Sequence, residues 1–556
     1  MLKLVLGASG SGKTTLLYAR IRARAEAGKR SILLVPEQFT SSTEARIYRE
    51  LGDALSGMVE SYSFTSLAEH ILAALGGAAV QTLTDAGRAV LVRRALEELQ
   101  DNVHYYYRHR RSAAFCQMAA ETIDELKSAG LSGQQLQELA RDCGTESAKL
   151  GELALIFQGY ESLLAGTGMD PADRLELAAD RLEAALARDE LPDFLREREV
   201  FIDEFDTFNA PKKRLMGAML AALPAVTVAL CEDGAPMQPG DLELFSGAKQ
   251  VAAQLRQLAR KNGAQVAAPE LLRRDLRHKD APGLAALTEL LETGSCTPPE
   301  SAPELRLFAA ASREEEARCA AAAIRRLMRQ GVRCGKIAVV CRDISLYRAA
   351  VRYEFRMAEI PLYCDEPTTP EFSAPATAVR ALLALLRGAD MTEQLTVLAK
   401  TGLCALTEPE VCALENYAYT WSPNAAAWRA EFTKSPRGFG DAELTEEDTL
   451  NLTRAEHARK KLVTAVDTLR SKVRSANAEQ ISRALYFCLK ELGAEEQQAA
   501  QVEDIRTARG IPAAEEAARE WNVVMQLLDE MARLLGSQGI TVPEYEDLFS
   551  LLLRSS

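Results

Sequence analysis

A glycine-rich stretch near the start of the sequence has the residue types of a phosphate-binding loop. It consists of Gly7, Ala8, Ser9, Gly10, Ser11, Gly12, Lys13 and Thr14, and it fits the pattern G-x-x-x-x-G-K-T. In such a loop, backbone N–H groups wrap phosphate oxygens at a helix N-terminus, the lysine reaches the β- and γ-phosphates, and the threonine hydroxyl can bind Mg²⁺. A glycine-rich turn that binds nothing is the alternative, and the complete pattern favours binding of ATP or GTP.

Two carboxylates have the types expected for the other half of such a site. Asp203 and Glu204 follow an apolar run that starts at Glu199. An aspartate at the end of a buried strand can hold Mg²⁺ through water, and the next glutamate can polarise the water that attacks the γ-phosphate. Acidic residues also end many ordinary strands, but the presence of the glycine-rich loop favours the catalytic interpretation. We therefore predict Mg²⁺ on Thr14 and Asp203, with Glu204 as a catalytic residue.

These residues need strands and helices to position them. Short apolar runs alternate with helical patterns in the first part of the chain, which predicts a parallel sheet and an α/β fold. The expected strands lie at residues 3–6, 31–35, the start of 199–206, and 225–230, with a strand-to-helix passage at 59–66. From about residue 84 to 186 one amphipathic helical pattern follows another, so we expect a helical insertion there.

Two patterns inside the helical insertion have competing interpretations. Residues 105–111 (YYYRHRR) place aromatic rings beside cations, which could stack bases and hold phosphates, but a solvated helix start is the favoured alternative. Residues 131–135 (LSGQQ) look like the signature of transporter-type ATPases, although they lie far from the acidic run at 199–206. We interpret them as a helix start with Ser132 as the cap.

A second α/β unit is expected after the Pro-rich linker at residues 297–303. It should contain a strand at 304–309, a helix opened by a Ser312–Glu315 capping box, a strand at 336–341 and a helix at 346–356. The chain is again helical from about residue 373, so we expect the sequence to be the N-terminal part of a longer protein. The predicted domains are 1–83 with 190–300, a helical insertion at 84–189, the start of a second domain at 304–372, and a helical insertion at 373–556.

The composition does not identify a binding partner, but it bears on the cellular compartment of the protein. The net charge of −13 gives no global basic field for nucleic acid, although a local groove could still carry one. Eleven cysteines occur without a C-x-x-C pair, and none of the five histidines makes a metal-ligand spacing with them, so a zinc site is not expected. The sequence shows no signal peptide and no apolar run long enough for a bilayer, which predicts a cytoplasmic protein with no membrane partner.

The motifs in their order resemble those of one family. They are the loop at 7–14, residues 35–40 (VPEQFT), 63–64 (SF), 202–208 (IDEFDTF), and 337–342 (IAVVCR) ahead of 360–361 (IP). This set is similar to the helicase-like half of AddB proteins, the second subunits of bacterial AddAB helicase-nucleases and relatives of the UvrD-type superfamily 1 helicases. The resemblance implies two RecA-like P-loop domains, the second incomplete here, each with a large helical insertion.

The same resemblance implies cofactors, partners and one further site residue. It implies ATP and Mg²⁺, an AddA-type subunit in a heterodimer, and DNA as substrate, both as a double-strand end and as a single strand, in recombinational repair. An iron–sulfur cluster and the nuclease domain are expected only beyond Ser556, so we expect no nuclease activity from this chain alone. Arg342 matches by position an arginine that reaches across the interdomain cleft to the γ-phosphate in UvrD-type helicases. A surface arginine paired with Asp343 is the alternative.

Departures from active helicases bear on ATP turnover. No Gln motif precedes the loop, residues 203–207 read DEFDT where UvrD-type chains have DEFQD, and the usual continuation after Glu232 is missing. These differences suggest weak or uncoupled hydrolysis, whereas Glu204 is present where AddB chains often lack it. A free-standing active superfamily 1 translocase therefore stays an alternative, and a P-loop kinase or GTPase unrelated to DNA is a third.

Overall fold

The computed structural model of the chain describes residues 1–77, 82–99, 101–109, 112–236, 244–364, 370–440, 443–536 and 539–555. Its named strands form one parallel sheet in the order β3-β2-β4-β5-β1-β6. They are β1 (Leu2–Gly7), β2 (Ser31–Leu34), β3 (Val59–Tyr62), β4 (Glu199–Ile202), β5 (Ala225–Cys231) and β6 (Glu270–Leu272). The α/β fold predicted from the sequence is confirmed, and β6 is a strand that the sequence analysis missed.

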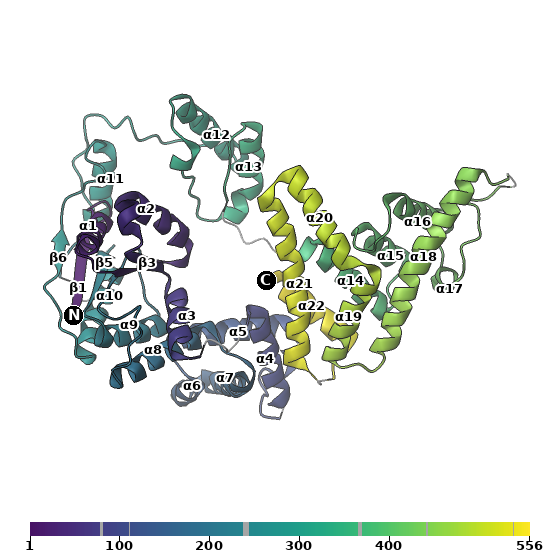
Figure 1. The fold of residues 1–556 in the computed structure, drawn as a ribbon, viewed down its shortest axis with the longest axis horizontal. Helices are drawn as coiled ribbons and strands as arrows, with labels where there is room; N and C mark the ends of the chain where they lie inside the picture. Colours follow the sequence, from purple (N-terminus) through teal and green to yellow (C-terminus); the bar gives the residue numbers. More distant parts are fainter. Residues whose placement is uncertain are drawn as a thin grey trace.

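Helices cover both faces of this sheet, because its strands are apolar on both sides. In β1, Leu4 and Leu6 point into one core while Val5 points into the other, as the two-residue period of a strand requires. The helices on the Val5 face are α1 (Lys13–Glu26) and α2 (Thr40–Ser56). Those on the Leu4 face are α3 (Phe64–Leu75), α8 (Pro171–Ala187), α9 (Ala210–Ala222) and α10 (Ser246–Lys261). Figure 1 shows these helices grouped around the sheet at one end of the molecule.

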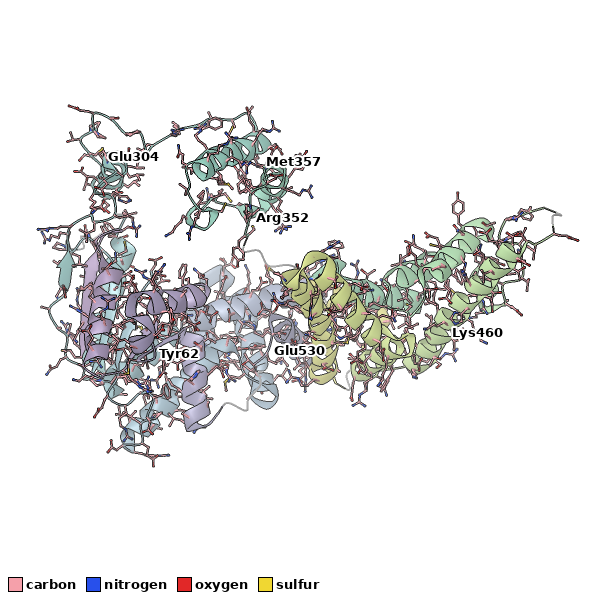
Figure 2. The ribbon with its side chains drawn as sticks, turned by 45° about the horizontal axis from the view of Figure 1, so that its top comes forward. Tyr62, Glu304, Arg352, Met357, Lys460 and Glu530 are labelled. Carbon is pink, nitrogen blue, oxygen red and sulfur yellow. The ribbon has the colours of Figure 1, made fainter. Side chains whose placement is uncertain are left out.

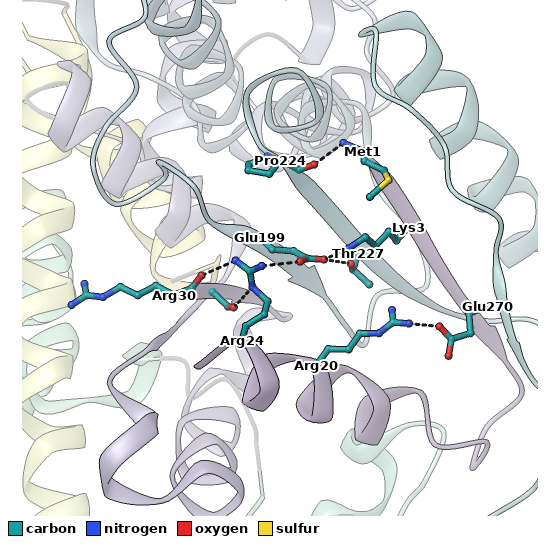
Figure 3. A network of polar contacts seen from close by, with 10 residues as sticks. Met1, Lys3, Arg20, Arg24, Arg30, Glu199, Pro224, Thr227 and Glu270 are labelled. Carbon is teal, nitrogen blue, oxygen red and sulfur yellow. Dashed lines mark hydrogen bonds and ion pairs between the residues drawn. The ribbon is translucent and has the colours of Figure 1, made fainter. Parts of the chain in front are cut away.

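The amino ends of the strands are tied together by a polar network around Glu199 (Figure 3). The Glu199 carboxylate, which begins β4, accepts hydrogen bonds from Lys3 Nζ at 2.8 Å and from the Thr227 hydroxyl at 2.9 Å. The Arg24 guanidinium of α1 lies 3.3 Å from the same carboxylate. These contacts hold the pKa of Glu199 below its usual value although burial opposes them, so β1, β4, β5 and α1 are joined by charge at the end of the sheet opposite residues 7–14.

The helical insertion expected after residue 84 is present. It contains α4 (Asp85–Glu98), α5 (Ala113–Ser128), α6 (Gly133–Ala140) and α7 (Ser147–Thr167), before α8 returns to the sheet. Ser132 caps α6 as predicted, because its hydroxyl accepts the N–H of Gln135 and the Gln135 side chain accepts the N–H of Ser132. In the 105–111 pattern, Arg110 and Arg111 lie outside the described residues. The Glu152 carboxylate accepts the backbone N–H groups of Tyr105 and Tyr106 at 2.7 and 3.1 Å.

The second predicted α/β unit differs from expectation. Its helices are present as α12 (Arg313–Arg329), capped by Ser312, and α13 (Ile344–Met357), and an unpredicted helix, α11 (Pro282–Thr293), precedes the linker. The strands predicted at 304–309 and 336–341 are wrong: both segments are irregular and neither is paired with a strand. Their apolar side chains are exposed, with Val340 at 89%. An apolar alternation becomes a strand only where a neighbour accepts its backbone hydrogen bonds.

The remainder of the chain is helical, as predicted. It contains α14 (Ala374–Arg387), α15 (Met391–Lys400), α16 (Glu408–Trp421), α17 (Ala425–Arg429), α18 (Glu446–Val473), α19 (Ala478–Leu492), α20 (Ala494–Arg509), α21 (Ile511–Leu535) and α22 (Val542–Ser555). Short 3₁₀ turns lie at Glu37–Phe39, Tyr107–His109, Gly144–Glu146, Cys334–Lys336 and Pro370–Phe372. No helix in the described ranges is long and apolar enough to cross a membrane.

The two helical insertions share one hydrophobic core. Leu96 of α4, Phe157 of α7, Leu382 of α14 and Leu548 of α22 belong to the same buried cluster. A polar contact crosses the same junction, since the Thr84 hydroxyl at the start of α4 donates to the buried carboxylate of Glu530 on α21. Figure 2 marks Glu530 where α21 meets the first insertion, and in both views α12 and α13 lie apart from the sheet. The two insertions therefore form one helical body.

Candidate nucleotide-binding site

The glycine-rich loop joins β1 to α1 at the carboxyl edge of the sheet. Gly10 and Gly12 have φ values of 84° and 91°, a left-handed conformation that glycine adopts without strain. A Cβ atom at Gly10 would come within 2.9 Å of the Asp275 carboxylate. Gly12 is the N-cap of α1 and no side chain caps that end, so the first N–H groups of the helix face the loop. This geometry is that of a phosphate cradle.

The Lys13 side chain arches back over the loop. Its ammonium group donates hydrogen bonds to the carbonyl oxygens of Gly7 and Ala8 at 2.7 and 2.8 Å. Burial lowers the pKa of Lys13, and the nearby Asp203 carboxylate opposes that shift. The ammonium group therefore lies inside the cradle beside an acidic residue.

The acidic pair lies beside the loop, as the sequence predicted. The Asp203 N–H donates to the Leu34 carbonyl oxygen at 3.1 Å, so the pairing of β4 with β2 continues to this residue. The buried Asp203 carboxylate accepts a hydrogen bond from the Glu204 N–H at 3.0 Å, and it lines the same cavity as Thr14. Burial raises the pKa of Asp203, and the Thr14 side chain and the Glu204 N–H oppose the rise. Thr14 and Asp203 thus line one cavity although a long insertion separates them in the sequence.

Glu204 has a strained backbone. Its φ is 65°, which is uncommon for a residue with a side chain. Such a conformation costs about 1–2 kcal/mol, and strain of this kind is found at functional sites more often than elsewhere. Burial raises the pKa of Glu204, and the neighbouring Asp203 charge raises it further. Glu204 lines the same cavity as the loop.

A segment after β6, which the sequence analysis did not single out, packs against the loop. The Leu276 N–H donates to the Gly10 carbonyl oxygen at 3.0 Å, and Arg277 Nη1 donates to the Ser9 hydroxyl at 3.2 Å. The Asp275 carboxylate fixes this turn by accepting the N–H of Arg277 at 2.9 Å. The sequence offers no signal for this contact, because it depends on the tertiary placement of β6 beside β1.

These parts enclose a cavity of about 520 Å³. It is lined by Ser9, Gly10, Gly12, Lys13, Thr14, Thr15, Arg46, Asp203, Glu204, Phe205, Asp206, Ala229, Cys231, Leu276 and Arg277. The residues fit ATP with Mg²⁺ on two grounds: the start of α1 has no side-chain cap, so its N–H groups are free for phosphate, and the cavity lining includes a hydroxyl and a carboxylate, oxygen ligands of the kind that Mg²⁺ prefers. Arg46 was not predicted from the sequence.

Arg342 is not brought to this cavity. It lies on the irregular segment before α13, is exposed, and does not line the cavity. Its neighbour Asp343 does not need it as a partner, because that carboxylate caps α13 by accepting the N–H of Ser345 at 2.9 Å. The catalytic role expected for Arg342 therefore stays a prediction.

Comparisons with known proteins show the family to which the chain belongs. A family model described as "ADDB, N-terminal" matches residues 4–288, which is more than half of the chain. The chain is 30% identical to the B-type subunit of the "ATP-dependent helicase/deoxyribonuclease" of Moorella thermoacetica, over 100% of this chain and 49% of that protein. It is 30% identical to the protein of the same name in Desulforudis audaxviator, over 98% and 48% respectively, and 24% identical to that of Clostridium acetobutylicum, over 100% and 48%. The chain spans about half the length of these relatives, and it belongs to the AddB family.

Proposed function

We propose that this chain binds ATP with Mg²⁺ and forms the helicase-like part of an AddB-type subunit of a DNA helicase-nuclease. One observation carries the proposal: Thr14 of a complete phosphate loop and Asp203 at the end of a nearby strand line the same cavity. That juxtaposition is what a Mg²⁺–nucleotide site requires. The names of the relatives, which include both an ATP-dependent helicase and a deoxyribonuclease, support the larger assignment.

Each site residue predicted from the sequence has a role in this proposal. The N–H groups at the start of α1 bind phosphate oxygens, and Lys13 binds the β- and γ-phosphates. Thr14 and Asp203 hold Mg²⁺, which when bound neutralises charge on the β- and γ-phosphate oxygens. Glu204 orients the attacking water as a catalytic residue. Arg342 would approach the γ-phosphate from a second RecA-like domain that begins at 304–372.

We further propose the setting that the family implies. The partner is an AddA-type subunit, the substrate is DNA with a double-strand end together with the single strands derived from it, and the protein acts in the cytoplasm in recombinational repair. The nuclease and an iron–sulfur cluster lie outside this sequence. The domain boundaries proposed from the sequence are retained, with one RecA-like domain at 1–83 and 190–300, and helical insertions at 84–189 and 373–556.

Calorimetric titration of the chain with ATP and Mg²⁺ tests the central claim. Lys13→Ala should weaken ATP binding about ten-fold or more, because a hydrogen bond to a charged group contributes about 1.5–3 kcal/mol. Lys29→Ala is the matched control, since Lys29 is exposed beyond the far end of α1. Unchanged ATP affinity in the Lys13 variant would remove the proposal.

A second measurement separates this function from a free-standing translocase. The departures at residues 203–207 favour weak turnover, so adding single-stranded DNA to the chain alone should leave its ATP hydrolysis nearly unchanged. A large stimulation by DNA would favour the active translocase instead.

A further inference from the structure

An arginine of the sheet domain itself projects towards the acidic pair. Arg46 lies on α2, and its guanidinium carbon is 4.8 Å from the centre of the Tyr18 ring. Tyr18 is 7% exposed and lies one helical turn after Thr14 on α1, so both side chains occupy one face of that helix. The cation–π contact therefore holds Arg46 on the side of α1 that carries Thr14.

Two carboxylates, those of Asp203 and Glu204, share the surroundings of Arg46. Arg46 lines the nucleotide cavity together with Asp203 and Glu204, and it also lines a second cavity of about 400 Å³ that shares Thr14 and both carboxylates. Its charge lowers the pKa of each carboxyl group, against burial, which raises them. Within the described ranges, Arg46 forms no ion pair and no hydrogen bond to a side chain. The Tyr18 ring contacts the guanidinium group through its π face, so the in-plane N–H donors of that group can bind a phosphate.

We propose that Arg46 is a γ-phosphate ligand and hence a catalytic residue supplied by the same domain as the loop. The inference rests on the proposed ATP site. In that site the Thr14–Asp203–Glu204 side of the cavity is where Mg²⁺ and the terminal phosphate belong, and Arg46 lines that side. A planar cation with several donors matches a terminal phosphate, and it can neutralise charge that develops there.

The other arginines are less suited to this task. Arg277 also lines the cavity, but it is hydrogen-bonded to Ser9 at the opposite part of the loop. Arg342 is exposed and outside the cavity. A purely structural role for Arg46, as a charge that balances Asp203 and Glu204, is the competing explanation. The two differ in one respect: only a γ-phosphate ligand distinguishes ATP from ADP.

The test compares ATP and ADP affinities of the chain by calorimetry in the presence of Mg²⁺. Arg46→Ala should weaken ATP binding about ten-fold or more, as loss of a charged hydrogen bond predicts, and ADP binding less than about two-fold. Arg46→Lys should recover part of the ATP affinity. Arg30→Ala is the matched control, because Arg30 is exposed just before β2, at the amino ends of the strands, and it should change neither affinity.

The outcomes separate this inference from the proposed function. Equal losses for ATP and ADP, or no loss for either, would overturn the role of Arg46. Arg46→Gln, which keeps the polar side chain but removes the charge, gives the same comparison if the alanine variant fails to fold. If Lys13→Ala retains full ATP affinity, the ATP site itself is wrong. If Lys13→Ala loses affinity while Arg46→Ala and Arg46→Gln keep the wild-type ratio of ATP to ADP affinity, only the inference about Arg46 fails.

Discussion

Replacing Glu204 by glycine is expected to make the sheet domain more stable than replacing it by alanine. Both changes remove the carboxylate, and they differ only in the Cβ atom. At φ 65° that atom costs about 1–2 kcal/mol, whereas the extra chain entropy of glycine costs about 0.5–1 kcal/mol. The net preference for glycine is about 1 kcal/mol, which is the reverse of the order found at ordinary helical positions.

Hydrogen exchange followed by mass spectrometry is the suitable assay. All three tryptophans, Trp421, Trp428 and Trp521, lie far along the chain from the sheet, so their fluorescence would not report on it. Peptides from β2 and β4 should exchange about five-fold more slowly in Glu204→Gly than in Glu204→Ala, since 1 kcal/mol corresponds to about that factor. Ala45→Gly, in the exposed part of α2, should show the opposite sign and serves as control. Equal or greater protection in the alanine variant would refute the assignment of strain to Glu204.

Two further predictions concern buried charge. Because burial raises the pKa of Asp203, the folded domain binds the proton more tightly than the unfolded chain, and stability falls as pH rises from the unfolded pKa through the folded one. Asp203→Asn should therefore stabilise the sheet at pH 7. It should not do so below about pH 4, the ordinary pKa range of an aspartate. Hydrogen exchange of β4 peptides, measured along a urea titration at each pH, gives the comparison. In the helical insertion, Lys127 Nζ lies 2.8 Å from the buried carboxylate of Asp170 and 2.8 Å from the partly exposed carboxylate of Asp173. Lys127→Met should lower the free energy of unfolding by about 3–5 kcal/mol in urea titrations followed by circular dichroism. The control, Lys149→Met at an exposed position, should leave it unchanged. Equal urea midpoints for the two variants would contradict the prediction for Lys127.

The phosphate loop and most of the sheet could be predicted from the sequence because their signals are local. The loop pattern is a consecutive run of residues, and the buried runs that became β1, β2, β4 and β5 are short, apolar and followed by helical periodicity. Asp203 could be assigned to the same site as Thr14, because a carboxylate that follows a buried strand in a protein with a phosphate loop is typical of a Mg²⁺ ligand. The cap at Ser132 follows from residues only three positions apart.

Contacts that depend on distant packing could not be predicted. Arg46 and Arg277 reach the cavity only because α2 and the segment after β6 are placed there by the sheet, and neither lies in a recognisable motif. The strands expected at 304–309 and 336–341 were predicted but did not form. Both segments carry an apolar pattern, yet no neighbouring strand pairs with either of them. The common core of the two insertions was also hidden, because its halves are separated by the whole second unit.

The shared helical core limits how this protein can be divided. The exposed segment at residues 297–303 looks like a natural place to cut, yet α4 lies before it and its packing partners α21 and α22 lie after it. A protease cleaving there would leave two pieces that stay associated through buried leucines and through the Thr84–Glu530 contact. Either piece produced alone would present an uncovered apolar face and would tend to aggregate. The unit that folds is therefore discontinuous in sequence, and its division follows the packing of the helices rather than the order of the chain.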